Sequence, residues 1–122
     1  MKKKKGIIPL KKKADTAFSI YIRNRDNGVC FTCGKKGTIK EMQNGHYESR
    51  RHNATRFDER NCHCQCVGCN VFKSGNMTIY ALKLQELYGR GILTELRKQA
   101  QEIKKFTRND LELIIEKYAY QN

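Results

Sequence analysis

The chain has 122 residues, enough for one domain with a modest core, because only 39% of the residues are apolar. Its 25 lysines and arginines outnumber 12 aspartates and glutamates and give a net charge of +13. This balance predicts a polyanionic partner, with nucleic acid as the first candidate. A membrane partner is not expected, since no run in the sequence approaches the ~20 apolar residues of a membrane span.

Residues 1–13 contain seven lysines and no acidic residue, which predicts a basic flexible arm ahead of a single domain over residues 14–122. A solubilising tail is the alternative for such a lysine run. The chain does not open with the apolar stretch of a secretory signal, so we expect its six cysteines to lie in a reducing cytoplasm. In that compartment, paired cysteines predict metal binding before disulfide bonds.

Helical periodicity begins after the arm. Apolar residues recur at three- and four-residue steps from Ala14, and Gly28 is suited to end the helix in a left-handed conformation. Two strands are predicted next, over residues 42–47 and 61–66, with a polar basic loop over residues 48–56 between them. A helix is expected to begin at Cys69 and Asn70.

Two Cys-x-x-Cys pairs predict a structural zinc site. Zinc favours four thiolate ligands in a tetrahedron, and the pairs supply Cys30, Cys33, Cys66 and Cys69. Their 32-residue separation exceeds the loop of a zinc finger, so a functional hairpin is expected between them. Cys62 and Cys64 are interpreted as small buried residues, and a shifted ligand set using Cys64 or His63 is the alternative.

The hairpin carries the candidate chemistry. Hydrolysis of a phosphodiester requires a base that activates water and a cation that neutralises charge. His46 lies on the first predicted strand between the zinc pairs, and Arg50 and Arg51 follow it as candidate phosphate contacts. A histidine that only donates a hydrogen bond within the turn is the alternative, but the zinc frame favours the base.

Three apolar stripes at helical spacing predict helices in the C-terminal part, residues 77–122. They run from Met77 to Tyr88, from Ile92 to Ile103 and from Leu111 to Tyr118. Thr107 and Asp110 have capping-box spacing ahead of the third stripe. These stripes are interpreted as core.

Three sequence blocks resemble the phage NinG (Rap) recombination proteins, and the resemblance covers most of the chain beyond the arm. The blocks are Asn44-Gly45-His46-Tyr47, Asn61-Cys62-His63-Cys64-Gln65-Cys66-Val67-Gly68-Cys69-Asn70 and Ser74-Gly75-Asn76. The resemblance implies a phage-encoded protein of the host cytoplasm with an α+β fold. Its core is expected to be a small treble-clef ββα-metal hairpin and helix of the HNH nuclease type, within residues 14–76, flanked by N- and C-terminal helices.

The resemblance also implies roles for individual residues. His46 is the expected general base, Asn70 the ligand of a catalytic Mg²⁺ or Mn²⁺, and Asn61 the brace of the loop that orients His46. The two asparagines can also exchange roles. His63 is interpreted as structural. Many HNH nucleases carry a carboxylate or a second histidine just before the base, where this chain has Gly45, so Asn44 or Asp58 is a further candidate ligand.

The sequence therefore predicts a zinc-stapled endonuclease that cuts branched DNA, such as a Holliday junction. Arg50, Arg51, Arg56 and Lys73 are the expected backbone contacts, and their binding should weaken as salt rises. A non-catalytic zinc module that binds DNA or RNA is the alternative. Symmetric cutting of a junction needs two active sites, which a homodimer would supply. The C-terminal helices are the candidate interface for such a homodimer.

Overall fold

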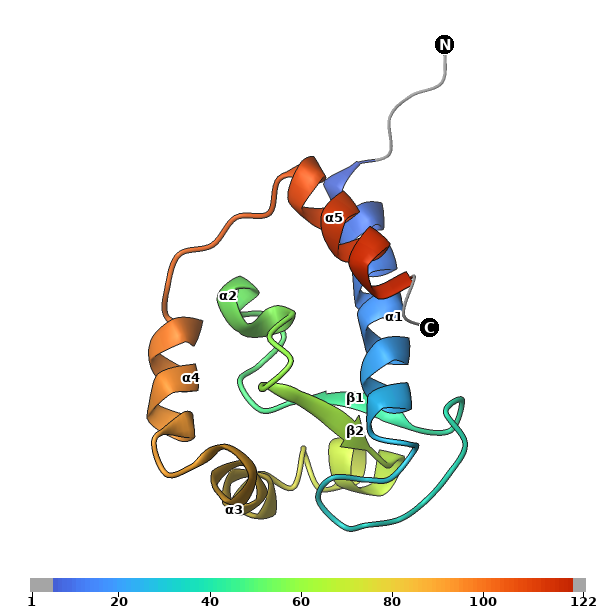
Figure 1. The fold of residues 1–122 in the computed structure, drawn as a ribbon, viewed down its shortest axis with the longest axis vertical. Helices are drawn as coiled ribbons and strands as arrows, with labels where there is room; N and C mark the ends of the chain where they lie inside the picture. The colour runs from blue at the N-terminus through green and yellow to red at the C-terminus, as the bar shows by residue number, and fades with distance from the viewer. Residues whose placement is uncertain (1–5, 120–122) are drawn as a thin grey trace.

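The computed structural model describes residues 6–119. Helices and one two-stranded antiparallel sheet make the fold α+β, as predicted. Figure 1 shows the hairpin between α1 on one side and α4 on the other. The elements in chain order are α1 (Ile7–Arg25), β1 (Gln43–His46), α2 (Asn53–Arg56), β2 (Cys62–Gln65), the π-helix η1 (Gly68–Phe72), α3 (Met77–Tyr88), α4 (Ile92–Ala100) and α5 (Arg108–Ala119).

Helix α1 begins at Ile7, so the prediction of a flexible arm over residues 1–13 was wrong for residues 7–13. Leu10 extends the buried stripe of Ala14 by one turn, and both pack against Leu111 of α5. Pro9 falls in the first turn, where the missing N–H would have had no helical partner. The remaining part of the predicted arm, residues 1–5, lies outside the described residues.

The sheet pairs Gly45 with His63 and His46 with Cys62. Both strands are one residue shorter at each end than predicted. Every residue of β2 is buried, because α1 covers Cys62 while the aromatic side chains of Phe31 and of α3 cover His63. The alternation of cysteines with polar residues along this strand predicts only one face toward the zinc and the core, whereas both faces are covered.

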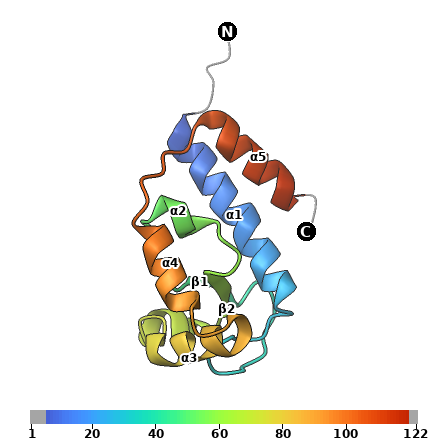
Figure 2. The same cartoon turned by 60° about the vertical axis from the view of Figure 1, so that its left-hand side comes forward.

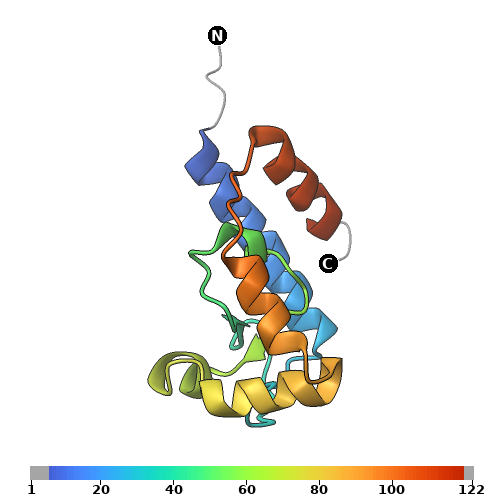
Figure 3. The same cartoon turned by 90° about the vertical axis from the view of Figure 1, so that its left-hand side faces the viewer.

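The C-terminal helices lie where the stripes predicted them, but not every stripe residue is in the core. Met77, Leu87 and Tyr88 of α3 are exposed, and α4 ends at Ala100 and leaves Ile103 95% exposed. Thr107 and Asp110 form the predicted capping box, in which each backbone N–H donates to the other side chain (2.9 and 3.1 Å). Helix α5 lies along α1, as Figures 2 and 3 show, and Tyr118 packs there against Phe18. Much of the apolar face of α5 is thus used within the chain.

Within residues 6–119, no helix combines the length and the apolar character that crossing a bilayer requires.

Candidate metal centre and active-site pocket

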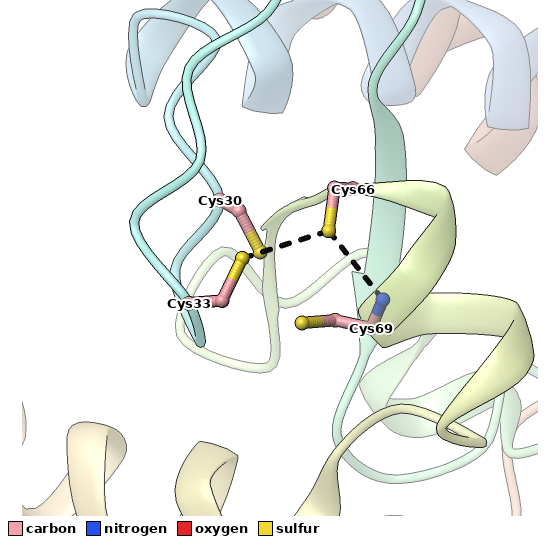
Figure 4. Close-up of side chains that lie close together, drawn as sticks. All are labelled: Cys30, Cys33, Cys66 and Cys69. Atoms are coloured by element: carbon pink, nitrogen blue, oxygen red, sulfur yellow. Dashed lines mark hydrogen bonds between the residues drawn. The ribbon is translucent and has the colours of Figure 1, made fainter.

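The four cysteines predicted to bind zinc lie together (Figure 4). Their Sγ atoms all lie within 4.8 Å of one another, and those of Cys33 and Cys66 are 3.6 Å apart. A tetrahedral zinc with Zn–S bonds of about 2.3 Å separates its sulfur ligands by about 3.8 Å. The cluster can therefore hold a metal ion such as zinc with little movement.

Polar groups around the cluster point at the sulfur atoms. The backbone N–H of Cys69 donates to Cys66 Sγ (3.4 Å), and Asn76 Nδ2 donates to Cys69 Sγ (3.7 Å). Asn76 reaches the sulfur because Ser74, Gly75 and Asn76 all have left-handed backbone (φ 49°, 92° and 50°). The turn follows η1, a π-helix of five residues that begins at Gly68, so Cys69 and Asn70 lie in its opening turn as predicted.

The spare thiols and His63 belong to the core. Cys62 contacts Phe18 and Ile22, and Cys64 lies beside the cluster without joining the four-sulfur group. Burial raises the pKa of the Cys64 thiol to about 12 and raises the pKa of Cys62 well above its ordinary value. Burial also lowers the pKa of His63 to about 4, so its neutral ring stacks on Phe31 with 4.0 Å between the ring centroids.

A pocket of about 330 Å³ lies between α1 and β1. It brings together four residues singled out from the sequence, namely His46, Asn70, Arg50 and Asn44. Its walls come from three segments of the chain, within residues 15–23, within residues 42–50 and at Asn70. The lining residues are Asp15, Ser19, Arg23, Met42, Gln43, Asn44, His46, Arg50 and Asn70.

The ring of His46 is held in one tautomer. Nε2 lies 2.9 Å from the carbonyl oxygen of Arg56, which can only accept, so Nε2 carries the proton and Nδ1 keeps its lone pair. Burial lowers the pKa of the imidazole, and this effect opposes the carbonyl contact, which raises it. His46 is therefore a neutral base at neutral pH.

The guanidinium of Arg56, predicted to contact DNA, is already paired within the protein. The Arg56 side chain forms a two-point ion pair with Asp15 and donates to the carbonyl of Arg50 (2.8 Å). Only 12% of the Arg56 side chain is exposed. Arg51 and Lys73 are exposed as expected, but neither lines the pocket.

The two asparagines of the predicted site differ in their surroundings. Asn61 is fully buried; it accepts a bond from the backbone N–H of Glu48 and donates to the carbonyls of Glu48 and Thr55. It braces the loop between the strands and does not line the pocket. Asn70 lines the pocket and donates Nδ2 to Gln43 Oε1 (2.7 Å). No described residue donates a hydrogen bond to Asn70 Oδ1.

The two further candidate ligands, Asn44 and Asp58, lie in different places. Asn44 Oδ1 is buried and accepts no bond within residues 6–119, whereas Asp58 pairs with Arg60 and lies outside the pocket. A side chain at position 45 requires Gln65 to move, because an added Cβ would lie 1.9 Å from Gln65 Oε1. This contact disfavours a carboxylate at the position before His46.

Sequence reasoning missed the wall of the pocket that α1 contributes. Asp15, Ser19 and Arg23 follow one another at four-residue steps and form a polar stripe beside the apolar stripe of Ala14, Phe18 and Ile22. The spacing was visible in the sequence. Nothing in it, however, indicated that this side of the helix faces His46.

The fold and the cysteine cluster define a small α+β protein with a four-cysteine site for a metal ion such as zinc. The sequence profile of the family described as "Bacteriophage Lambda NinG protein" matches residues 1–122, so the chain belongs to the NinG family. It is 40% identical over 87 residues to protein ninG of Salmonella phage P22 and 38% identical over 87 residues to protein ninG of Escherichia phage lambda.

Each of these two matches covers 70% of this chain and 42% of the relative. The chain thus spans less than half the length of the curated relatives it matches. No solved structure matches the chain.

Proposed function

We propose that this protein is a zinc-stapled endonuclease of the HNH type that hydrolyses phosphodiesters in branched DNA during phage recombination. The observation that carries the proposal is the pocket in which a neutral, oriented His46 and the carboxamide of Asn70 lie together. The treble-clef description of the hairpin, the cysteine site and η1 belongs to the same proposal.

His46 supplies the base. Its free Nδ1 accepts a proton from a water molecule as the water oxygen attacks phosphorus and one P–O ester bond breaks. Asn61 acts as a positioning residue, because it fixes Glu48 and Thr55 in the loop that leads to the Arg56 carbonyl. The carbonyl in turn holds Nε2 of His46.

A divalent cation suits the pocket chemically. Mg²⁺ and Mn²⁺ favour oxygen ligands, and the buried Asn44 Oδ1 is an oxygen that no described donor satisfies. Asn70 Oδ1 and Asn44 Oδ1 are the groups of this chain that would hold the ion. When bound, the ion supplies positive charge to the phosphate and the leaving oxygen.

The DNA backbone is expected to run along the first turns of α1. Lys11 and Lys12 line a second hollow that shares Asp15 and Arg50 with the active-site pocket. The positive charges of this surface, which we call the basic track (Lys11, Lys12 and Arg50), therefore continue from the pocket along the helix. Contacts of this kind bind phosphates without reading sequence.

Cleavage of defined substrates tests the proposal. The wild-type protein is incubated with a four-way junction, a flap and a linear duplex, with Mg²⁺, with Mn²⁺ or without added divalent metal. We expect metal-dependent cutting of a branched substrate and its loss in His46→Ala. Binding of these substrates without cutting of any would overturn the enzyme and favour a non-catalytic zinc module.

A further inference from the structure

The charge of Arg23 has no carboxylate partner in the described part of the chain. Four other half-buried arginines in residues 6–119, namely Arg25, Arg56, Arg60 and Arg108, each form an ion pair with a carboxylate. Arg23 is also half-buried, yet it forms no ion pair with any carboxylate in that part of the chain. Burial lowers its pKa, but a guanidinium stays charged at neutral pH. A partly buried cation of this kind favours an anion as its partner.

Backbone carbonyls fix the Arg23 guanidinium at the pocket. Nε donates to the carbonyl of Ser19 (3.1 Å), and Nη1 donates to those of Ile39 (2.5 Å) and Met42 (3.4 Å). Nη2 forms no bond with any residue of the described chain. Because Arg23 lines the same pocket as His46, its remaining donors are available to an anion beside the imidazole.

We propose that Arg23 makes this pocket a phosphate-binding site, with Nη2 donating to a non-bridging phosphate oxygen. In the nuclease proposed above, on which this role rests, the anion is the phosphodiester that is cut. Arg23 is then a catalytic residue, because it contacts the reacting group and stabilises the charge that grows on the phosphate oxygens during attack. A guanidinium fixed by three carbonyls needs little reorganisation for this contact.

Inorganic phosphate is the probe for a test that requires no cleavage. The NMR signals of the His46 ring are followed in the wild type, in Arg23→Gln and in Arg90→Gln, a control that removes one charge from an exposed residue outside the pocket. We expect phosphate to shift the signals in the wild type and in the control, and to leave them unchanged in Arg23→Gln. Equal shifts in Arg23→Gln and the wild type overturn the proposal.

Cleavage kinetics provide the second readout. Loss of a contact made chiefly in the transition state should lower kcat of Arg23→Gln by about 100-fold with little change in KM. Added guanidinium ions should restore part of the rate of Arg23→Ala, which they could not do for a protein that had merely lost its fold. A kcat for Arg23→Gln within about threefold of the wild type, well below the expected loss, contradicts the role.

Arg23→Lys keeps the test valid if Arg23→Gln does not fold, because lysine retains the charge but not the planar fork. We expect it to bind phosphate more weakly than the wild type, and wild-type affinity overturns the proposal. The two proposals can also fail separately. A phosphate response that requires Arg23, without cutting of any DNA, supports the anion site and overturns the nuclease. Cutting that is indifferent to Arg23→Gln overturns the role of Arg23 and leaves the nuclease in place.

Discussion

At the scale of single residues, the state of His46 depends on contacts made by its neighbours. The carbonyl of Arg56 selects the tautomer, and Asp15 holds the Arg56 side chain. Neither contact involves a residue adjacent to His46 in the chain. The chemistry of the imidazole therefore depends on the packing of α1 against the loop between the strands.

The lowered pKa of His46 predicts the pH dependence of cleavage. In the proposed nuclease the neutral ring is the active form, and burial moves the pKa of His46 below the ordinary value of 6.5. The cleavage rate should therefore persist below pH 6.5 and fall only as the pH drops through the lowered pKa. Single-turnover rates measured between pH 4.5 and 8, with zinc content checked at each pH, provide the test. An acid limb with its midpoint above 6.5 would contradict this assignment.

Asp15→Asn tests the support of His46 from α1. The side chains of Asp15 and Arg56 are only 18% and 12% exposed, so removing one charge leaves the other partly buried and unpaired. We expect a loss of about 2 kcal/mol in the free energy of unfolding, between the values for surface and buried pairs. Urea unfolding measures it, with Glu112→Gln as a control that breaks the more exposed pair with Arg108. Equal losses in the two variants would count against the argument.

At the scale of elements, the hairpin has room for only one kind of residue before His46. An added Cβ at Gly45 would lie 1.9 Å from Oε1 and 2.6 Å from Cδ of Gln65. Gln65 cannot easily move away, because it is fully buried and donates to Thr32 Oγ1 (3.1 Å) and the carbonyl of Gly75 (2.9 Å). These two bonds tie β2 to the segment between Cys30 and Cys33 and to the turn after η1.

Gly45→Ala should destabilise the protein by about 2 kcal/mol through overpacking. Its cost should fall when Gln65 is replaced by Ala, because the smaller side chain frees the space that the new methyl group requires. The measurement is a double-mutant cycle of unfolding free energies. Gly91→Ala is the matched control, since nothing lies within 4 Å of its added Cβ. Strictly additive costs at positions 45 and 65 would show that the overlap is relieved elsewhere.

Periodicity predicted the C-terminal helices well, because each carries its own apolar stripe. It failed at the start of α1, where Leu10 is buried against Leu111 of α5. It also failed on β2, whose second face is covered by aromatic residues from outside the hairpin. In both cases the contact that buries the residue comes from an element far away in the chain. Local sequence patterns cannot predict such a contact.

At the scale of the whole molecule, the cysteine site joins the loop after α1 to the end of β2 and to η1. Its ligands could be predicted because each Cys-x-x-Cys pair is local. The pocket could be predicted only in part, because His46 and Asn70 belong to recognisable blocks whereas Asp15 and Arg23 depend on the packing of α1. The pairing of Arg56 with Asp15 could not be predicted for the same reason.

Zinc content should distinguish ligands from spare thiols. Structural zinc contributes about 10–16 kcal/mol in small zinc domains, which is comparable to the whole stability of a domain of this size. Cys69→Ser should therefore lose bound zinc and cooperative unfolding, whereas Cys62→Ser should keep one zinc ion per chain. Elemental analysis and thermal unfolding measure both properties. Full zinc retention in Cys69→Ser would argue against the four-sulfur site.

In the proposed function, His46 is the base of a metal-dependent nuclease. The most direct measurement of this role is the single-turnover cleavage rate of a four-way junction, with Mn²⁺, by the wild type, His46→Ala and His52→Ala. His52 is a histidine outside the pocket and serves as the matched control. We expect the cleavage rate to fall by at least about 100-fold in His46→Ala and to stay near that of the wild type in His52→Ala. Equal cleavage by the wild type and His46→Ala would contradict this role.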